Sequence, residues 1–187
     1  EVPMTEAAVR KAFENFPAII ANTEAIIDDC SITMLAHNDN NRKAFTASEA
    51  DDQVLLTKLA KSGLSRRYHN NAKAVQRVNS ELKVILELGF CAYFLITWDI
   101  IKYARSAGYF HVGRGSGANS IVAYCMGITD VDPLELDLYF ERFINPHRTS
   151  PPDFDIDFSW DERDDVTDYI FKRYGREHTA LLATYNT

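Results

Sequence analysis

Three aspartates alternate with large apolar residues between residues 153 and 158. If this stretch is a strand, Asp153, Asp155 and Asp157 share one face, because successive side chains of a strand point to opposite sides. Neighbouring carboxylates on that face lie roughly 7 Å apart, and like charges this close repel unless a cation lies between them. Carboxylate oxygens are the ligands that magnesium prefers. The pattern therefore predicts a divalent metal site on the strand.

Two other interpretations compete for the acidic stretch. An edge strand with a solvated acidic face shows the same alternation, and from the pattern alone this alternative stays open. A calcium loop also carries acids at its positions 1, 3 and 5, but it requires glycine at position 6 and glutamate at position 12. Those positions hold Phe158 and Asp164, so a calcium loop is disfavoured.

A glycine-rich loop at residues 112–120 is the second candidate site. Small residues let backbone N–H groups approach an anion, and a helix beginning after the loop adds a positive field. The side chains of Arg114, Ser116 and Ser120 add further donors. A P-loop is excluded because no Gly-Lys-Ser/Thr follows, and the glycine spacing is a weak match to a dinucleotide fingerprint. A tight structural connection without a ligand remains the alternative.

Two arginines precede the acidic stretch. Arg142 and Arg148 precede the first aspartate by eleven and five residues, so we expect them near the start of the strand. A guanidinium there can bind phosphate through two hydrogen bonds. The alternative is a surface ion pair, which contributes little to stability.

The surrounding elements must hold these residues together. Helical periodicity, caps and breakers predict helices over residues 5–16, 17–28, 48–68, 72–88, 92–107, 118–126 and 161–174. Strands are predicted at 109–112, 153–158 and 179–185, and residues 138–144 are predicted to be extended. Residues 30–46 are polar and rich in asparagine, which predicts a linker or loop. This order indicates an α/β (α+β) fold with helices packed on a small sheet.

Composition excludes several classes of protein. The 187 residues are 46% hydrophobic and 25% charged, as in a globular domain. The net charge of −7 is local, because eight acids and one base lie within residues 150–168 and the rest of the chain is balanced. The longest apolar run, residues 90–101, is too short to span a bilayer, and no basic-then-apolar stretch opens the sequence, so secretion is not expected. Three widely spaced cysteines disfavour a disulfide framework and fit the reducing cytoplasm. The chain begins without methionine and ends in an apolar run, so we expect a piece of a longer protein.

Several motifs in this order resemble the palm of the bacterial replicative DNA polymerase III alpha subunit, a C-family polymerase. They lie at residues 87–101, 110–133, 140–146 and 152–158, and the resemblance extends over residues 80–187. Residues 1–70 only loosely resemble the segment that joins the N-terminal phosphoesterase-like domain of that family to its palm. Residues 159–163 and 178–185 are more similar to the error-prone paralogue.

The resemblance implies a polymerase-beta-type nucleotidyltransferase palm with an incomplete sheet. Residues 1–70 would be a helical connector and residues 71–187 a partial palm. Asp153 and Asp155 would be ligands of two Mg²⁺ ions, with Asp157 outside the main ligand set. Gly115 and Ser116 would contact the incoming triphosphate. Arg142 would be a further phosphate partner, and the family's third carboxylate lies on a later strand.

The implied function is DNA-directed DNA polymerisation in the cytoplasm, with primer-template DNA and deoxynucleoside triphosphates (dNTPs) as partners. The sliding clamp and other replisome subunits would bind parts outside this chain, and no membrane is involved. The isolated chain is expected to be inactive. A non-catalytic metal- or nucleotide-binding module is the alternative.

Overall fold

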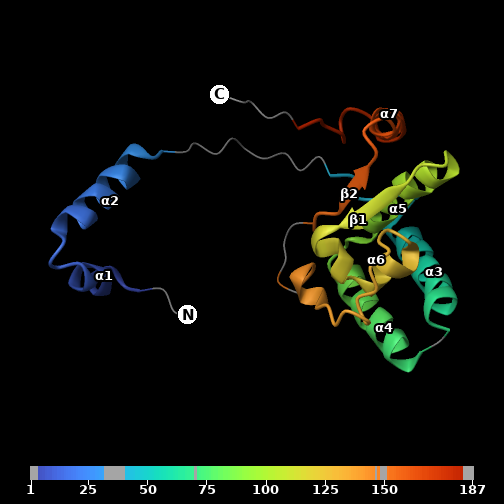
Figure 1. The fold of residues 1–187 in the computed structure, drawn as a ribbon, viewed down its shortest axis with the longest axis horizontal. Coiled ribbons are helices and arrows are strands. Elements are labelled where there is room, and N and C mark those ends of the chain that lie inside the picture. Colours follow the sequence, from blue (N-terminus) through green and yellow to red (C-terminus); the bar gives the residue numbers. More distant parts are fainter. Residues whose placement is uncertain (1–3, 32–40, 70, 146, 148–150, 183–187) are drawn as a thin grey trace. The chain divides into compact units, whose positions relative to one another are not determined.

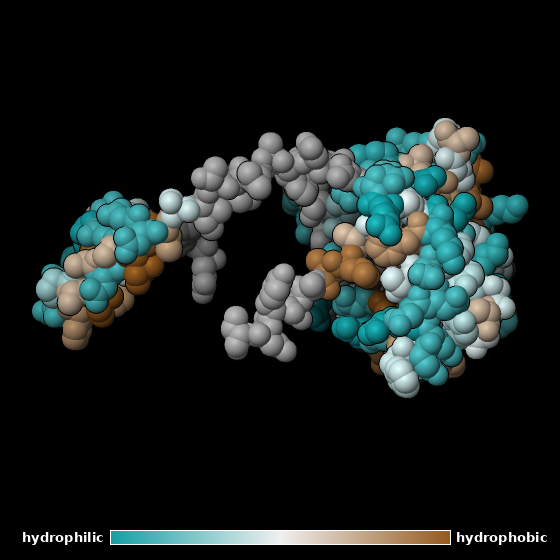
Figure 2. All heavy atoms as spheres, turned by 90° about the horizontal axis from the view of Figure 1, so that it is seen from above, coloured by the Kyte–Doolittle hydropathy of each residue, from teal (hydrophilic) through white to brown (hydrophobic). Residues whose placement is uncertain are grey.

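Two short helices near the N-terminus form a unit of their own. The computed structural model describes residues 4–31, 41–69, 71–145, 147 and 151–182, and the chain divides into two units, Glu1–Asp39 and Asn40–Thr187 (Figure 1). In the first unit, Thr5 caps α1 (Glu6–Ala12) and Pro17 opens α2 (Pro17–Asp29). Neither helix buries a residue, and Figure 2 shows their apolar side chains as brown patches at the surface.

The second unit is a helical cluster with one small sheet. Its helices are α3 (Glu49–Tyr68), α4 (Ala72–Glu87), α5 (Cys91–Ser106), α6 (Ile121–Met126) and α7 (Arg163–Tyr174). Its strands are β1 (His111–Arg114) and β2 (Asp155–Phe158), and two 3-10 helices are η1 (Gly115–Asn119) and η2 (Phe140–Arg142). The arrangement is α+β, in agreement with the predicted class.

Local sequence signals explain where the main helices begin. The Ser48 hydroxyl accepts a hydrogen bond from the amide of Asp51, so Ser48 is the N-cap of α3. Asn71 caps α4 in the same way, accepting from the amides of Lys73 and Ala74. Helix ends are also close to those predicted, with α6 ending before Gly127.

Apolar faces of α3, α4, α5 and α6 form the core. Leu56, Ile85, Phe94 and Val122, one from each helix, are fully buried in it. Helices α3 and α6 approach closely at Gly63, where a Cβ atom would overlap the backbone carbonyl of Cys125. The core thus holds α6, and with it the loop that precedes α6, against three longer helices.

The two strands pair antiparallel, with Arg114 opposite Asp155 and His111 opposite Phe158. The predicted strand at 109–112 begins two residues later, and the predicted strand at 153–158 begins only at Asp155. Pairing stops there because β1 turns into η1, and the amide of Phe154 donates to the Tyr93 hydroxyl at 2.6 Å instead.

Two predictions of extended structure are wrong. Residues 138–144 contain the helical turn η2, since Phe140, Phe143 and Ile144 are buried at helical spacing and the amide of Ile144 donates to the carbonyl of Phe140 at 2.9 Å. Residues 179–182 are not in a strand, because no described strand lies beside them to share backbone hydrogen bonds. The remainder of that predicted strand, 183–185, lies outside the described residues.

The three cysteines are free thiols. Cys91 and Cys125 are buried, and burial raises the pKa of these thiols to about 11 and about 12. Cys30, at the end of α2, is exposed. The expected absence of a disulfide framework is thus consistent with the structure.

Within the described ranges, no single helix is long and apolar enough to cross a membrane. Helices α4 and α5, bent by 113° where they meet, pass the same test of length and composition only as a pair.

Candidate functional site

The acidic face of β2 forms one side of the candidate site. Asp155 and Asp157 point to the same side, since both reach the guanidinium of Arg114. Their side chains are 46% and 54% exposed, whereas Phe154 and Ile156 pack on the core. The predicted alternation of faces is therefore confirmed for this stretch. Asp153 precedes the strand and is exposed.

The glycine-rich loop forms the other side of the site. It continues from β1 as η1, and Gly115 takes a left-handed conformation with φ +71°. A Cβ atom on Gly115 would overlap a carboxylate oxygen of Asp155, and one on Gly117 would lie 2.6 Å from the ring of Phe154. The structure thus brings the predicted anion loop into direct contact with the predicted acidic strand.

Arg114 lies between these two sides. Its Nε donates to Oδ2 of Asp157 at 2.7 Å, and its Nη1 lies 3.6 Å from Oδ2 of Asp155. The hydrogen bond to Asp157 and the charges of both carboxylates raise the pKa of Arg114. This guanidinium, predicted as an anion donor, therefore partly neutralises the acidic face.

The two serines of the loop have different environments. Ser116 is half-buried in η1, and its carbonyl accepts from Nδ2 of Asn119 at 2.8 Å. Ser120 is fully buried, caps α6 and donates its hydroxyl proton to Glu81. Ser120 therefore does not serve as the predicted donor to a bound anion, because it is buried and its hydroxyl proton is donated to Glu81.

Arg142 is exposed at the end of η2, and η2 contacts η1. The structure therefore places this arginine on an element beside the loop, while its predicted contact with phosphate stays a prediction. Arg148, the second predicted basic residue, lies outside the described residues.

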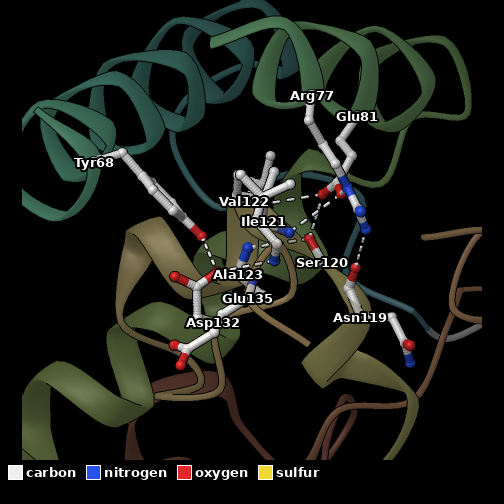
Figure 3. A network of polar contacts seen from close by, with 11 residues as sticks. Tyr68, Arg77, Glu81, Asn119, Ser120, Ile121, Val122, Ala123, Asp132 and Glu135 are labelled. Carbon is white, nitrogen blue, oxygen red and sulfur yellow. Dashed lines mark hydrogen bonds and ion pairs between the residues drawn. The ribbon is translucent and has the colours of Figure 1, made fainter. Parts of the chain in front are cut away.

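An ion pair between a half-buried arginine and a buried glutamate lies behind the loop. Figure 3 shows Arg77 and Glu81 of α4 facing the first turn of α6. Oε1 of Glu81 accepts from Nε of Arg77 at 3.0 Å and from the amide of Ile121 at 3.2 Å. Oε2 accepts from the hydroxyl of Ser120 at 2.8 Å and from the amide of Val122 at 3.2 Å. Every lone-pair direction of this carboxylate thus has a donor.

Burial raises the pKa of Glu81 above its usual value, and the bonds from Ser120, Arg77 and the two amides oppose part of that rise. Sequence reasoning missed this pair. Its signal is a charged residue on the apolar face of α4, between Val78 and Ile85, where a solvated side chain does not fit.

A second acid, Asp132, orders the chain after α6. Its Oδ1 accepts from the hydroxyl of Tyr68 at 2.5 Å and from the amides of Leu134 and Glu135 (Figure 3). Burial and this bond raise the pKa of Tyr68. The turn that leads towards η2 is therefore tied to α3.

The donor chemistry at the sheet suits a hard divalent cation. Asp153 and Asp155 offer exposed carboxylate oxygens, the ligand type of magnesium. Within residues 4–31, 41–69, 71–145, 147 and 151–182, no three or more His, Cys, Asp or Glu side chains converge as a metal-binding group. Metal binding by Asp153 and Asp155 therefore stays a prediction.

Comparison with known proteins gives consistent matches. The family described as bacterial DNA polymerase III alpha NTPase domain matches residues 54–187. An error-prone DNA polymerase of Symbiobacterium thermophilum is 40% identical over 176 residues, covering 94% of this chain and 16% of that protein. DNA polymerase III subunit alpha of Halalkalibacterium halodurans is 39% identical over 186 residues, covering 98% and 17%. The same subunit of Escherichia coli (strain K12) is 36% identical over 195 residues, again covering 98% and 17%. The chain thus spans less than a fifth of the length of these relatives.

Proposed function

The chain belongs to the bacterial DNA polymerase III alpha family, and from this premise we propose that it is part of the palm of a DNA-directed DNA polymerase. In the intact enzyme, the primer 3′-hydroxyl would attack the alpha-phosphate of a dNTP. The proposed palm has the polymerase-beta-type nucleotidyltransferase fold. Residues 71–187 would form this partial palm and residues 1–70 a helical connector, and that division remains a prediction.

One observation carries the proposal: the contact between the glycine loop and the acidic strand. Gly115 lies against the carboxylate of Asp155, and the pairing of Arg114 with Asp155 fixes this approach at the end of the sheet. A phosphate held by the loop would therefore lie next to carboxylates able to hold a metal. A solvated edge strand requires no such contact.

Each residue then has a separate task. Asp153 and Asp155 would hold Mg²⁺, which when bound lowers the pKa of an attacking hydroxyl and stabilises negative charge on the phosphates. Gly115 would offer its backbone and Ser116 its hydroxyl to the triphosphate. Arg142 would contact a phosphate from η2, on the neighbouring element. Arg114 reduces the charge repulsion between Asp155 and Asp157 when no metal ion lies between them.

The partners follow from the same role. Primer-template DNA and dNTPs would be the substrates, and the sliding clamp and other replisome subunits would bind elsewhere in the longer protein. A bacterial polymerase of this kind works on DNA in the cytoplasm. Relatives of both the replicative and the error-prone type match at similar identity, so the choice between these roles stays open.

Asp155→Asn in the full-length polymerase tests the proposal. We expect nucleotide incorporation to fall by at least about a hundredfold while the Kd for primer-template changes little, because the substitution removes charge from the metal site alone. Asp157→Asn is the matched control on the same strand face, and it should retain incorporation within a few-fold. Near-normal incorporation by Asp155→Asn at saturating Mg²⁺ would contradict the proposal and favour a non-catalytic binding module.

The isolated 187-residue chain should extend no primer. A two-metal displacement needs ligands that fix both ions about 3.5–4 Å apart, and this chain offers two carboxylates to that set. We expect Mg²⁺ or Mn²⁺ to bind only in the millimolar range, measured by titration calorimetry with Asp153→Asn as the control. Templated extension by the chain, abolished in that control, would refute this expectation.

A further inference from the structure

Helix α4 carries two ion pairs of the same i,i+4 spacing in opposite environments. Lys83 and Glu87 are 3.8 Å apart with side chains 75% and 62% exposed, as in an ordinary surface pair. Arg77 and Glu81 are 3.0 Å apart with side chains 22% and 2% exposed. Removing a charged pair from water costs desolvation free energy. The position of the second pair therefore needs a structural or functional explanation, whereas that of the first does not.

The contacts of the buried pair lead to the loop of the proposed nucleotide site. Glu81 accepts from the hydroxyl and amides of residues 120–122, as described above, and so holds the end of the loop. Arg77 donates through Nη2 to the carbonyl of Asn119 at 2.9 Å. Asn119 is 94% buried and donates through Nδ2 to the carbonyl of Ser116 at 2.8 Å. Three side chains thus connect α4 to the backbone of Ser116.

The same pair borders a cleft of about 380 Å³ between α4 and the segment that leads into η2. Arg77 and Glu81 line one wall, and Phe140 and Glu141 line the other. Arg142 is the next residue of η2 after Glu141. Removal of the Arg77 side chain would therefore open into existing space, which a small ion can enter.

We propose that Arg77 and Glu81 are positioning residues for nucleotide binding, and that the side chain of Asn119 connects them to the backbone carbonyl of Ser116. This inference rests on the proposed function. The loop contains three glycines and would otherwise adopt many backbone conformations, so its amides must be fixed before they can bind phosphates without a large entropy loss. The buried charges fix the loop in the unliganded protein.

The first experiment measures steady-state kinetics of Arg77→Ala in the full-length polymerase. We expect the KM for dNTP to rise about tenfold or more, with a smaller change in kcat and an unchanged Kd for primer-template. Lys83→Ala, from the exposed pair on the same helix, should leave all three values unchanged. Added guanidinium ion should lower the KM of Arg77→Ala, because the cleft admits it, and should not affect the Lys83→Ala enzyme.

A second variant separates positioning from general folding. Asn119→Asp keeps the size of the side chain but cannot donate to the carbonyl of Ser116 when ionised, and it leaves the Arg77–Glu81 pair intact. It should raise the KM for dNTP in the same direction as Arg77→Ala. If Arg77→Ala fails to fold, Asn119→Asp and Arg77→Lys decide the question, since lysine lacks the second nitrogen needed to reach both Glu81 and Asn119.

Hydrogen exchange of the 187-residue chain tests the inference without polymerase activity. Amides of residues 115–122 should exchange faster in Asn119→Asp and Arg77→Lys than in Lys83→Ala. Unchanged exchange there, or an unchanged KM in a folded Asn119→Asp enzyme, would overturn the inference. Failure of the proposed function is distinguishable, because then Asp155→Asn would retain incorporation whatever the loop does.

Discussion

The loop side of the site, residues 111–126, and the strand side, residues 153–174, both depend on carboxylates, but in opposite environments. On the loop side, Glu81 is 2% exposed and bonded to four donors. On the strand side, Asp155 and Asp157 are about half exposed and share one guanidinium, that of Arg114. The carboxylate of Glu81 therefore has its hydrogen-bonding positions occupied, whereas carboxylate oxygens of Asp155 and Asp157 remain accessible to water.

Helix α7 extends the comparison. It packs on α5 through Asp99, which accepts from the hydroxyls of Tyr169 and Tyr174 at 2.8 Å and pairs with Arg173 at 3.2 Å. The rings of Tyr103 and Tyr169 stack with their centroids 3.8 Å apart. Tyr174 is buried and the side chain of Asp99 is 13% exposed, whereas that of Arg173 is 48% exposed, so α7 is anchored by aromatic contacts and by hydrogen bonds to a largely buried carboxylate.

The difference indicates how this chain can divide its charges between two roles. A buried, fully bonded carboxylate fixes geometry, because any movement leaves a polar group unpaired. An exposed carboxylate can exchange a guanidinium for a cation at little cost. The loop side therefore suits a rigid binding site for an anion, and the strand side suits carboxylates that bind and release a cation.

The contrast between the two sides is wrong if the buried carboxylate contributes no more to the free energy of unfolding than the exposed carboxylates do. Glu81→Ala should lower the free energy of unfolding by about 3 kcal/mol, because Arg77 and two amides lose their acceptor in a buried place. Asp157→Ala should lower it by less than about 1 kcal/mol, as its ion pair with Arg114 is exposed. Urea unfolding of the chain, followed by circular dichroism, measures both, and equal losses would contradict the comparison.

Arg142→Ala sharpens the comparison with an effect on binding and none on the fold. Arg142 is exposed, so its removal should leave the unfolding midpoint unchanged. In the full-length polymerase, the KM for dNTP should rise about tenfold, since a charge-assisted bond to phosphate contributes about 1.5 kcal/mol. Steady-state kinetics with Arg142→Lys as a partial-rescue control measures this. An unchanged KM would remove Arg142 from the proposed site.

The smallest effect concerns acid stability on the strand side. The hydroxyls of Tyr103 and Tyr109 donate to Asp165 and hold the pKa of this carboxyl below its usual value. A depressed pKa stabilises the folded state above the unfolded pKa, and the gain is lost as pH falls through the folded pKa. Tyr103→Phe should therefore be less stable than the parent at pH 7, with the difference narrowing below about pH 4.

Thermal unfolding of both proteins from pH 7 to pH 3 measures this difference. Tyr139→Phe is the control, because Tyr139 is an exposed tyrosine in the segment before η2. A constant difference between parent and Tyr103→Phe across this range would show that Asp165 does not contribute.

Much of this arrangement follows from local sequence. The cap at Ser48 and the apolar spacing of α4 predict helices close to those observed. The alternation around Asp155 predicts the two faces of β2. These signals lie within a few residues of one another, so periodicity and turn chemistry are sufficient to find them.

The missed features depend on contacts distant in sequence. Glu81 and Ser120 are 39 positions apart, and only their packing shows that the serine hydroxyl bonds to the carboxylate. Residues 138–144 are predicted to be extended, whereas Phe140–Arg142 form the 3-10 turn η2. Burial of Phe143 and Ile144 in the core decides that conformation, and burial is a tertiary property.

The contrast among the three thiols has a practical consequence for labelling. Alkylating reagents react with thiolates, so Cys91 and Cys125, with raised pKa values and buried sulfur atoms, are protected at neutral pH. Cys30 is exposed at the end of α2. A maleimide dye would therefore attach to the N-terminal unit of this chain without modifying the unit that carries the loop and the strand.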